Sequence, residues 1–186
     1  MNGVSGNDDV GGAERLRLFL ALRLRGEILD EIERWQRERL RDIRIVPREH
    51  LHVTLAFLGH RPGGELESIV GALRDAAAGA GEIRLTPVRF RETRNAGMLV
   101  LEDDGGNAAQ LAEDVQERLE RLGVYRRESR AWLPHLTVAR WRKRPGLGLE
   151  SPPVRTFVPS DAAAYLSRLR PSGAQYEVLQ TVALGG

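Results

Sequence analysis

The sequence predicts an α+β fold that contains an internal duplication and mostly antiparallel strands. Helix-like and strand-like segments are mixed along the whole chain, and the order strand, helix, loop, strand occurs once in each half. The last strand of each set contains the tripeptide His-x-Thr, and the spacing from Phe19 to His52 resembles that from Val100 to His135. Equivalent elements at similar spacing indicate that one structural unit has been repeated.

The elements of the first half follow from hydrophobic periodicity and chain breakers. Ile28, Ile32 and Trp35 fall on one helical stripe, and Pro47 interrupts the chain before the next apolar run. The first half is therefore predicted to contain, in order, a strand at 16–24, a helix at 27–41, a strand that ends at Gly59 and a helix at 65–78.

The second half repeats the same kinds of segment. Leu111, Val115 and Leu119 have helical spacing, and Gly123 is placed to end that helix. The predicted elements are strands at 82–92 and 98–103, a helix at 108–122, a strand at 133–141, an exposed loop at 143–153, and a hairpin of 154–169 and 174–184 joined by the turn RPSG.

Length and composition set limits on the class of protein. The 186 residues suffice for one domain, predicted at 15–186, and the polar segment 1–14 is predicted to be a disordered tail. Without cysteine there is no disulfide framework or thiolate nucleophile, and we expect a cytoplasmic protein. No uninterrupted apolar run reaches the ~18 residues of a membrane span, so no membrane association is expected. No heptad pattern is evident, and a monomer is expected.

The basic residues are almost all arginine. The formal charge is only +2, and Lys143 is the single lysine. Arginine suits phosphate because its planar fork donates two parallel hydrogen bonds, but a bias in base composition of the genome would give the same excess. The net charge by itself does not predict a nucleic-acid partner.

Each His-x-Thr places an imidazole beside a hydroxyl. Residues i and i+2 of a strand share a face, so His52 and Thr54 point one way, as do His135 and Thr137. Strict alternation puts Phe57 on the opposite face of the first strand. Two imidazoles can act as base and acid, while two hydroxyls hold phosphate oxygens, which suits in-line attack on a strained cyclic phosphodiester without a metal.

Each histidine also has a simpler interpretation. A single His-x-Thr is more often a satisfied polar pair than a catalytic one, but two copies in repeated contexts favour catalysis. His50 and His52 could form a metal pair, yet the sequence offers no third ligand, and no metal or other cofactor is expected. His50 is interpreted as a bystander and His60 as a solvated loop residue.

The segments HLHVTLAFLG, PHLTVAR and YLSRLRPSGAQYEVL together resemble the two-histidine phosphoesterases, and most closely the RNA 2′,3′-cyclic phosphodiesterases, formerly called 2′-5′ RNA ligases. The resemblance implies a bilobal fold with pseudo-twofold symmetry, in which two antiparallel sheets face a central cleft and helices lie outside. It implies hydrolysis of a nucleoside or RNA-terminal 2′,3′-cyclic phosphate to a 2′-phosphomonoester without metal.

The resemblance also implies roles for individual residues. His52 would be the acid toward the 3′ leaving oxygen and His135 the base for water, while Thr54 and Thr137 would hold the phosphate. Arg140 and Phe57 would flank the base or phosphate, which requires a bulge because alternation turns both away from their histidines.

Two departures from the family pattern and two alternative activities accompany this interpretation. Ile45 stands where relatives often carry tryptophan, and His50 stands where asparagine is common. Reversible 2′-5′ ligation of RNA ends uses the same residues, with a hydroxyl in place of water. A non-catalytic module that binds RNA ends is a further alternative, although the two intact tripeptides argue against it.

Overall fold

The computed structural model describes residues 14–150, 152–171 and 173–185. Apart from Glu14, the predicted tail at 1–14 lies outside these residues. Among the described residues, no helix combines the length and apolar character that crossing a bilayer requires. The strands are β1 Arg15–Leu22, β2 Arg44–Ile45, β3 Val53–Pro62, β4 Arg84–Glu92, β5 Ala96–Asp104, β6 His135–Arg140, β7 Ala162–Arg170 and β8 Gly173–Val182. The helices are α1 Gly26–Arg39, α2 Leu66–Ala78 and α3 Asn107–Arg121, with short 3₁₀ helices η1 Arg48–His50 and η2 Gly63–Glu65.

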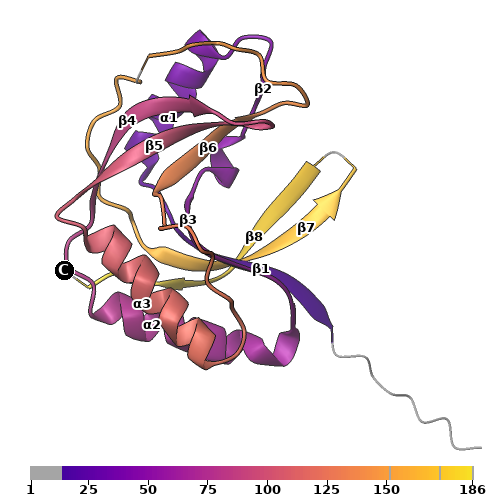
Figure 1. The fold of residues 1–186 in the computed structure, drawn as a ribbon, viewed down its shortest axis with the longest axis vertical. Helices are drawn as coiled ribbons and strands as arrows, with labels where there is room; N and C mark the ends of the chain where they lie inside the picture. Colours follow the sequence, from indigo (N-terminus) through magenta and orange to yellow (C-terminus); the bar gives the residue numbers. More distant parts are fainter. Residues whose placement is uncertain (1–13, 151, 172, 186) are drawn as a thin grey trace, which may run out of the picture.

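All eight strands form one curled antiparallel sheet in the order β4-β5-β6-β3-β1-β7-β8, with β2 paired to β6 (Figure 1). The α+β prediction is therefore confirmed at this level, whereas the prediction of two separate sheets is wrong. Val53 of β3 pairs with Leu136 of β6, and this single register pair joins the two halves of the sheet.

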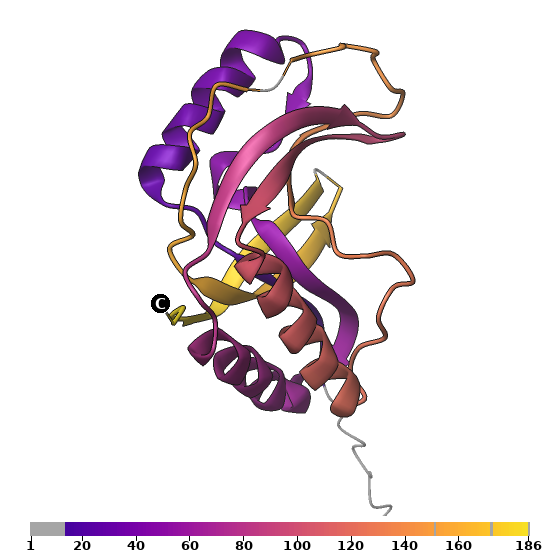
Figure 2. The same ribbon diagram turned by 60° about the vertical axis from the view of Figure 1, so that its left-hand side comes forward.

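The helices pack on the outer side of the curled sheet, as expected. Helices α2 and α3 lie side by side at one end, and α1 lies at the other end beside β4 (Figures 1 and 2). Trp35 of α1 contacts Phe90 of β4, with ring centroids 5.7 Å apart. The apolar stripes of all three helices merge with the outer face of the sheet in one core, which buries Leu18, Leu20 and Leu22 of β1.

The other face of β1 belongs to a second, smaller core. Phe19 and Ala21 pack there with Ala163 and Tyr165 of β7, and Tyr176 of β8 borders them. A strand buried on both faces explains the nearly continuous apolar run of the β1 sequence. This second cluster forms the floor beneath His52.

Two predicted boundaries are wrong. His60 lies within β3 and not in a loop, although it is exposed as expected, and its carbonyl accepts a hydrogen bond from Arg15. The hairpin strand predicted from 154 begins only at Ala162. Phe157 instead makes an isolated bridge to Leu85 of β4, so this stretch crosses from one half of the sheet to the other.

Candidate active site

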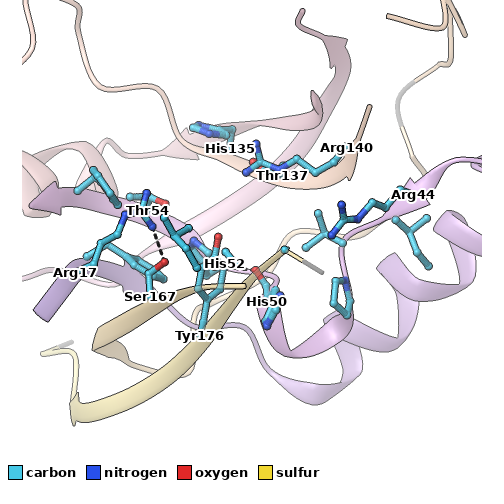
Figure 3. A pocket seen from close by; sticks show the side chains of 18 residues that line it. Arg17, Arg44, His50, His52, Thr54, His135, Thr137, Arg140, Ser167 and Tyr176 are labelled. Carbon is cyan, nitrogen blue, oxygen red and sulfur yellow. Dashed lines mark hydrogen bonds between the residues drawn. The ribbon is translucent and has the colours of Figure 1, made fainter. Parts of the chain in front are cut away.

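The concave side of the sheet holds a cleft of about 600 Å³. His52, Thr54, His135 and Thr137 all line it (Figure 3). Phe57 is a further lining residue. Figure 3 shows the first motif on β3 and the second on β6, on opposite sides of the space. The structure thus brings together the two tripeptides that the sequence separates.

The two motif strands have the same local construction. In His52–Phe57 and in His135–Arg140, the burial pattern is identical: histidine and threonine are half-buried, the residue between them is buried, two further residues are buried, and the last is exposed. A strictly alternating strand would not bury two consecutive residues on one face. The repetition indicates the same interruption in both strands.

That interruption is a β-bulge directly after each threonine. On β3, Leu55 has no partner in the register with β1, which passes from Thr54 to Ala56. On β6, Val138 has no partner in the register with β5, which passes from Thr137 to Ala139. One extra residue shifts the alternation of every side chain beyond it.

The bulges turn Phe57 and Arg140 toward the cleft, where both are lining residues. The bulge that the family resemblance requires is therefore present in each strand. The alternation that assigned Phe57 to the face opposite His52 is wrong, because Leu55 and Ala56 both enter the outer core. Phe57 is 48% exposed and free to meet a ligand.

Both catalytic candidates are oriented by the same hydrogen bond. The Nδ1 of His52 lies 2.7 Å from the carbonyl oxygen of His50, and the Nδ1 of His135 lies 2.9 Å from that of Leu133. A carbonyl only accepts, so each Nδ1 carries a proton. In the neutral tautomer each Nε2 then has a lone pair that can accept a proton.

The surroundings of His52 are aromatic. Its ring centroid lies 4.8 Å from that of Phe19, 5.7 Å from that of Tyr165 and 5.5 Å from that of Tyr176. Burial in this setting lowers the pKa of His52 to about 4, although the hydrogen bond to the His50 carbonyl opposes the shift. The nearby His50, His135 and Arg140 lower it further. His52 is therefore neutral at pH 7 in the free protein.

His50 contributes more than a bystander would. Its carbonyl orients His52, and its ring packs against Tyr176 with centroids 4.6 Å apart. Any residue could supply that carbonyl, so the imidazole itself has no assigned part in it. Within the described ranges, no group of three His, Asp or Glu side chains is arranged to hold a metal.

Several lining residues were missed by the sequence analysis. Arg17 of β1 stacks over the Phe57 ring at 4.6 Å and donates to the hydroxyl of buried Ser167 at 2.5 Å. Arg44 of β2 is directly opposite Arg140 in the β2–β6 ladder. Arg17 lies two residues before Phe19 in β1 and Ser167 two residues after Tyr165 in β7, a spacing that could have placed both on the cleft face, whereas Arg44 carries no such signal.

The cleft is cationic. Arg17, Arg44 and Arg140 line it, and the described lining residues include no aspartate or glutamate. Like charges directly opposite one another, as Arg44 and Arg140 are, repel, and an anion between them relieves the repulsion. Ile45, where tryptophan was expected, lies on the rim and is 38% exposed.

A curled antiparallel sheet with a His-x-Thr strand from each half agrees with the class inferred from sequence, the two-histidine phosphoesterases. The family model for the 2′-5′ RNA ligase superfamily matches residues 24–174, so the chain belongs to that superfamily. A protein of Methanocaldococcus jannaschii named RNA 2′,3′-cyclic phosphodiesterase is 27% identical over 175 residues, which cover 89% of this chain and 99% of that protein.

Solved structures share the fold. Escherichia coli LigT complexed with 3′-AMP superposes with a TM-score of 0.80 at 22% identity, covering 93% of this chain and all of LigT. The protein TT0787 of Thermus thermophilus gives a TM-score of 0.70 at 26% identity, covering 92% of this chain and 99% of that one.

Proposed function

We propose that the protein hydrolyses 2′,3′-cyclic phosphate ends of RNA to 2′-phosphomonoesters, with two histidines as base and acid and no catalytic metal. The observation that carries this proposal is the pair of bulged His-x-Thr strands facing one cationic cleft. The similarity to the M. jannaschii phosphodiesterase supports the reaction class.

In the proposed reaction, a water oxygen attacks phosphorus and the bond from phosphorus to the 3′ oxygen breaks. One imidazole Nε2 takes a proton from the water, and the other imidazolium gives a proton to the leaving oxygen. Thr54 and Thr137 hold the non-bridging oxygens, and Arg140 balances their negative charge. The products are a 2′-phosphomonoester and a free 3′ hydroxyl.

The lowered pKa of His52 supports assigning it as the base and His135 as the acid. A neutral ring whose Nδ1 proton is already donated to a carbonyl can accept at Nε2 but has no proton there to give. This assignment is the reverse of the one implied by the family resemblance.

A second groove supports an RNA end over a mononucleotide as substrate. It encloses about 470 Å³ and shares Thr54, Phe57 and His135 with the cleft. Among its other lining residues, Arg91, Tyr125 and Trp132 suit phosphates and stacked bases, while Arg130 is paired with Glu128, which also lines the groove. A nucleotide adjoining the reactive one would be accommodated there.

The test is a panel of 2′,3′-cyclic mononucleotides and cyclic-ended RNAs incubated with the protein in EDTA, with products read by phosphorus NMR. The proposal expects 2′-phosphate products. A 3′-phosphate product would overturn the choice of leaving oxygen, and binding without turnover would favour the RNA-end binding module. Adding RNA with a free 5′ hydroxyl tests ligation, which water at ~55 M disfavours by mass action.

A further inference from the structure

Three polar side chains are buried in the described part of the chain: Gln36, Gln116 and Ser167. Ser167 accepts a hydrogen bond from Arg17 inside the cleft. Gln36 lies in the last turn of α1 and Gln116 lies within α3, each on the buried face of its helix. Each donates its side-chain amide to backbone carbonyls of the chain that forms or borders the sheet.

The carbonyls nearest to the two amides belong to equivalent positions of the two motifs. Gln36 Nε2 donates to the Val138 carbonyl at 2.8 Å, and Gln116 Nε2 donates to the Leu55 carbonyl at 2.9 Å. Val138 and Leu55 are the bulged residues that follow Thr137 and Thr54. A bulge disrupts the ladder locally, and a buried carbonyl there needs another donor.

The pairing crosses between the halves of the sequence. Gln36 lies on α1, between β1 and β3, yet it serves the second motif on β6. Gln116 lies on α3, between β5 and β6, yet it serves the first motif on β3. Gln36 also donates to the Val46 carbonyl at 3.0 Å, which ties the segment after β2 to β6 near the Arg44–Arg140 pair.

Stability alone does not explain Gln36. The Oε1 of Gln36 is buried and has no hydrogen-bond partner among the described residues. An unsatisfied buried acceptor costs about 1–3 kcal/mol, whereas an apolar side chain of similar size would cost nothing of the kind. The Val138 carbonyl also receives the backbone N–H of Val46 at 2.9 Å, so Gln36 is not its only donor.

We propose that Gln36 and Gln116 are positioning residues, which fix the two bulges and thereby hold Arg140 and Phe57 on the catalytic face. Gln36 acts on Arg140 through Val138, and Gln116 acts on Phe57 through Leu55. This inference rests on the proposed cyclic phosphodiesterase reaction. It assigns a catalytic consequence to two residues that do not line the cleft of the two histidines, although Gln116 also borders the second groove.

The first test replaces each glutamine by methionine, which keeps the volume and removes the donor. We expect Gln36→Met and Gln116→Met each to lower kcat/KM about ten- to a hundredfold, as small misplacements of catalytic groups do. Gln110→Met, an exposed position on α3, is the matched control and should leave kcat/KM unchanged. The Tm of Gln36→Met should change little, because the variant removes both the unpaired Oε1 and the donor to the Val46 carbonyl.

Double-mutant cycles separate positioning from general damage. Gln36→Met should cost less than twofold in an Arg140→Ala background but keep its full cost in Phe57→Ala, and Gln116→Met should show the opposite pattern. Equal losses in both backgrounds, or losses that follow Tm, would overturn the proposal. If a methionine variant does not fold, Gln→Glu replaces it, and its deficit should grow as rising pH ionises the carboxyl.

A second measurement distinguishes failure of the proposed function from failure of the positioning roles. The same cycles are read in the Kd of adenosine 2′-monophosphate, which requires no turnover. Absence of hydrolysis would overturn the cyclic phosphodiesterase assignment, while the crossed pattern in Kd would still support the positioning roles. Additive effects in Kd as well as in kcat/KM would reject them.

Discussion

The strands β3 and β6 carry the same motif on the same bulged backbone but present different chemistry to the cleft. At β3, a half-buried His52 lies among aromatic rings, and Phe57 follows the bulge. β6 offers His135 from the opposite side and ends in Arg140 (Figure 3). The two tripeptides are alike in sequence and backbone, but the neighbouring elements give their histidines different surroundings. Acid–base catalysis needs that inequality, because one group must accept a proton while the other donates one.

The largest expected effect tests whether both strands are needed. His52→Ala and His135→Ala should each reduce kcat for a cyclic-ended RNA about 10²–10⁴-fold, since each removes a proton-transfer group. The measurement is release of 2′-phosphate in EDTA. His60→Ala is the control, because His60 is exposed and is not among the lining residues of the cleft. Full activity in His52→Ala or in His135→Ala would contradict the hypothesis that both histidines transfer protons.

Arg140 and Phe57, the exposed residues that follow the two bulges, should differ in the kind and in the size of their contribution to activity. Arg140→Ala should lower kcat/KM about a hundredfold for every substrate, because a hydrogen bond from a charged group to phosphate is worth roughly 1.5–3 kcal/mol. Phe57→Ala should cost only a few-fold and should depend on the base, since stacking is its contribution. Steady-state kinetics on four cyclic mononucleotides would measure both, and a base-dependent loss in Arg140→Ala would contradict this division.

The pH profile of kcat/KM tests the inequality of the histidines. With His52 as base, a pKa of about 4 predicts full kcat/KM down to about pH 5 and an acid limb near pH 4. Exchanging the two roles would leave the shape of this profile unchanged, because the active form carries one proton on the pair of histidines in either assignment, so the profile tests the pKa of His52 and not its role. Reactivation after preincubation at low pH controls for unfolding, and proton NMR of the imidazoles identifies the ring that titrates.

The smallest expected effect concerns stability. The pKa of His52 is lowered from 6.5 to about 4 in the folded protein, so the unfolded chain binds the proton between these pH values and the folded chain does not. The free energy of unfolding should therefore fall as the pH drops from about 6.5 to 4, by roughly 1–3 kcal/mol from this residue. Urea melts of wild type and His52→Asn should show a shallower pH dependence in the variant, with His60→Asn unchanged.

Much of the fold could be predicted because its signals are local. The stripe of Ile28, Ile32 and Trp35 identified α1, and the apolar runs identified β1 and β3, to within a few residues. The prediction of a strand over 154–161 was wrong because the bridge of this segment, from Phe157 to Leu85, depends on a strand that is distant in sequence. The two-sheet prediction was wrong because one pair, Val53 with Leu136, decides whether the halves join.

The sequence by itself determined which residues carry the candidate chemistry: two histidines and two threonines, each pair on one face of a strand. The internal duplication, the domain limits and the monomeric, cytoplasmic state stay predictions. Only the tertiary structure decided that Phe57 and Arg140 join those residues, because a bulge changes side-chain direction without changing composition. It also decided that His52 is neutral, since its pKa is set by rings from β1, β7 and β8, which lie far away in sequence.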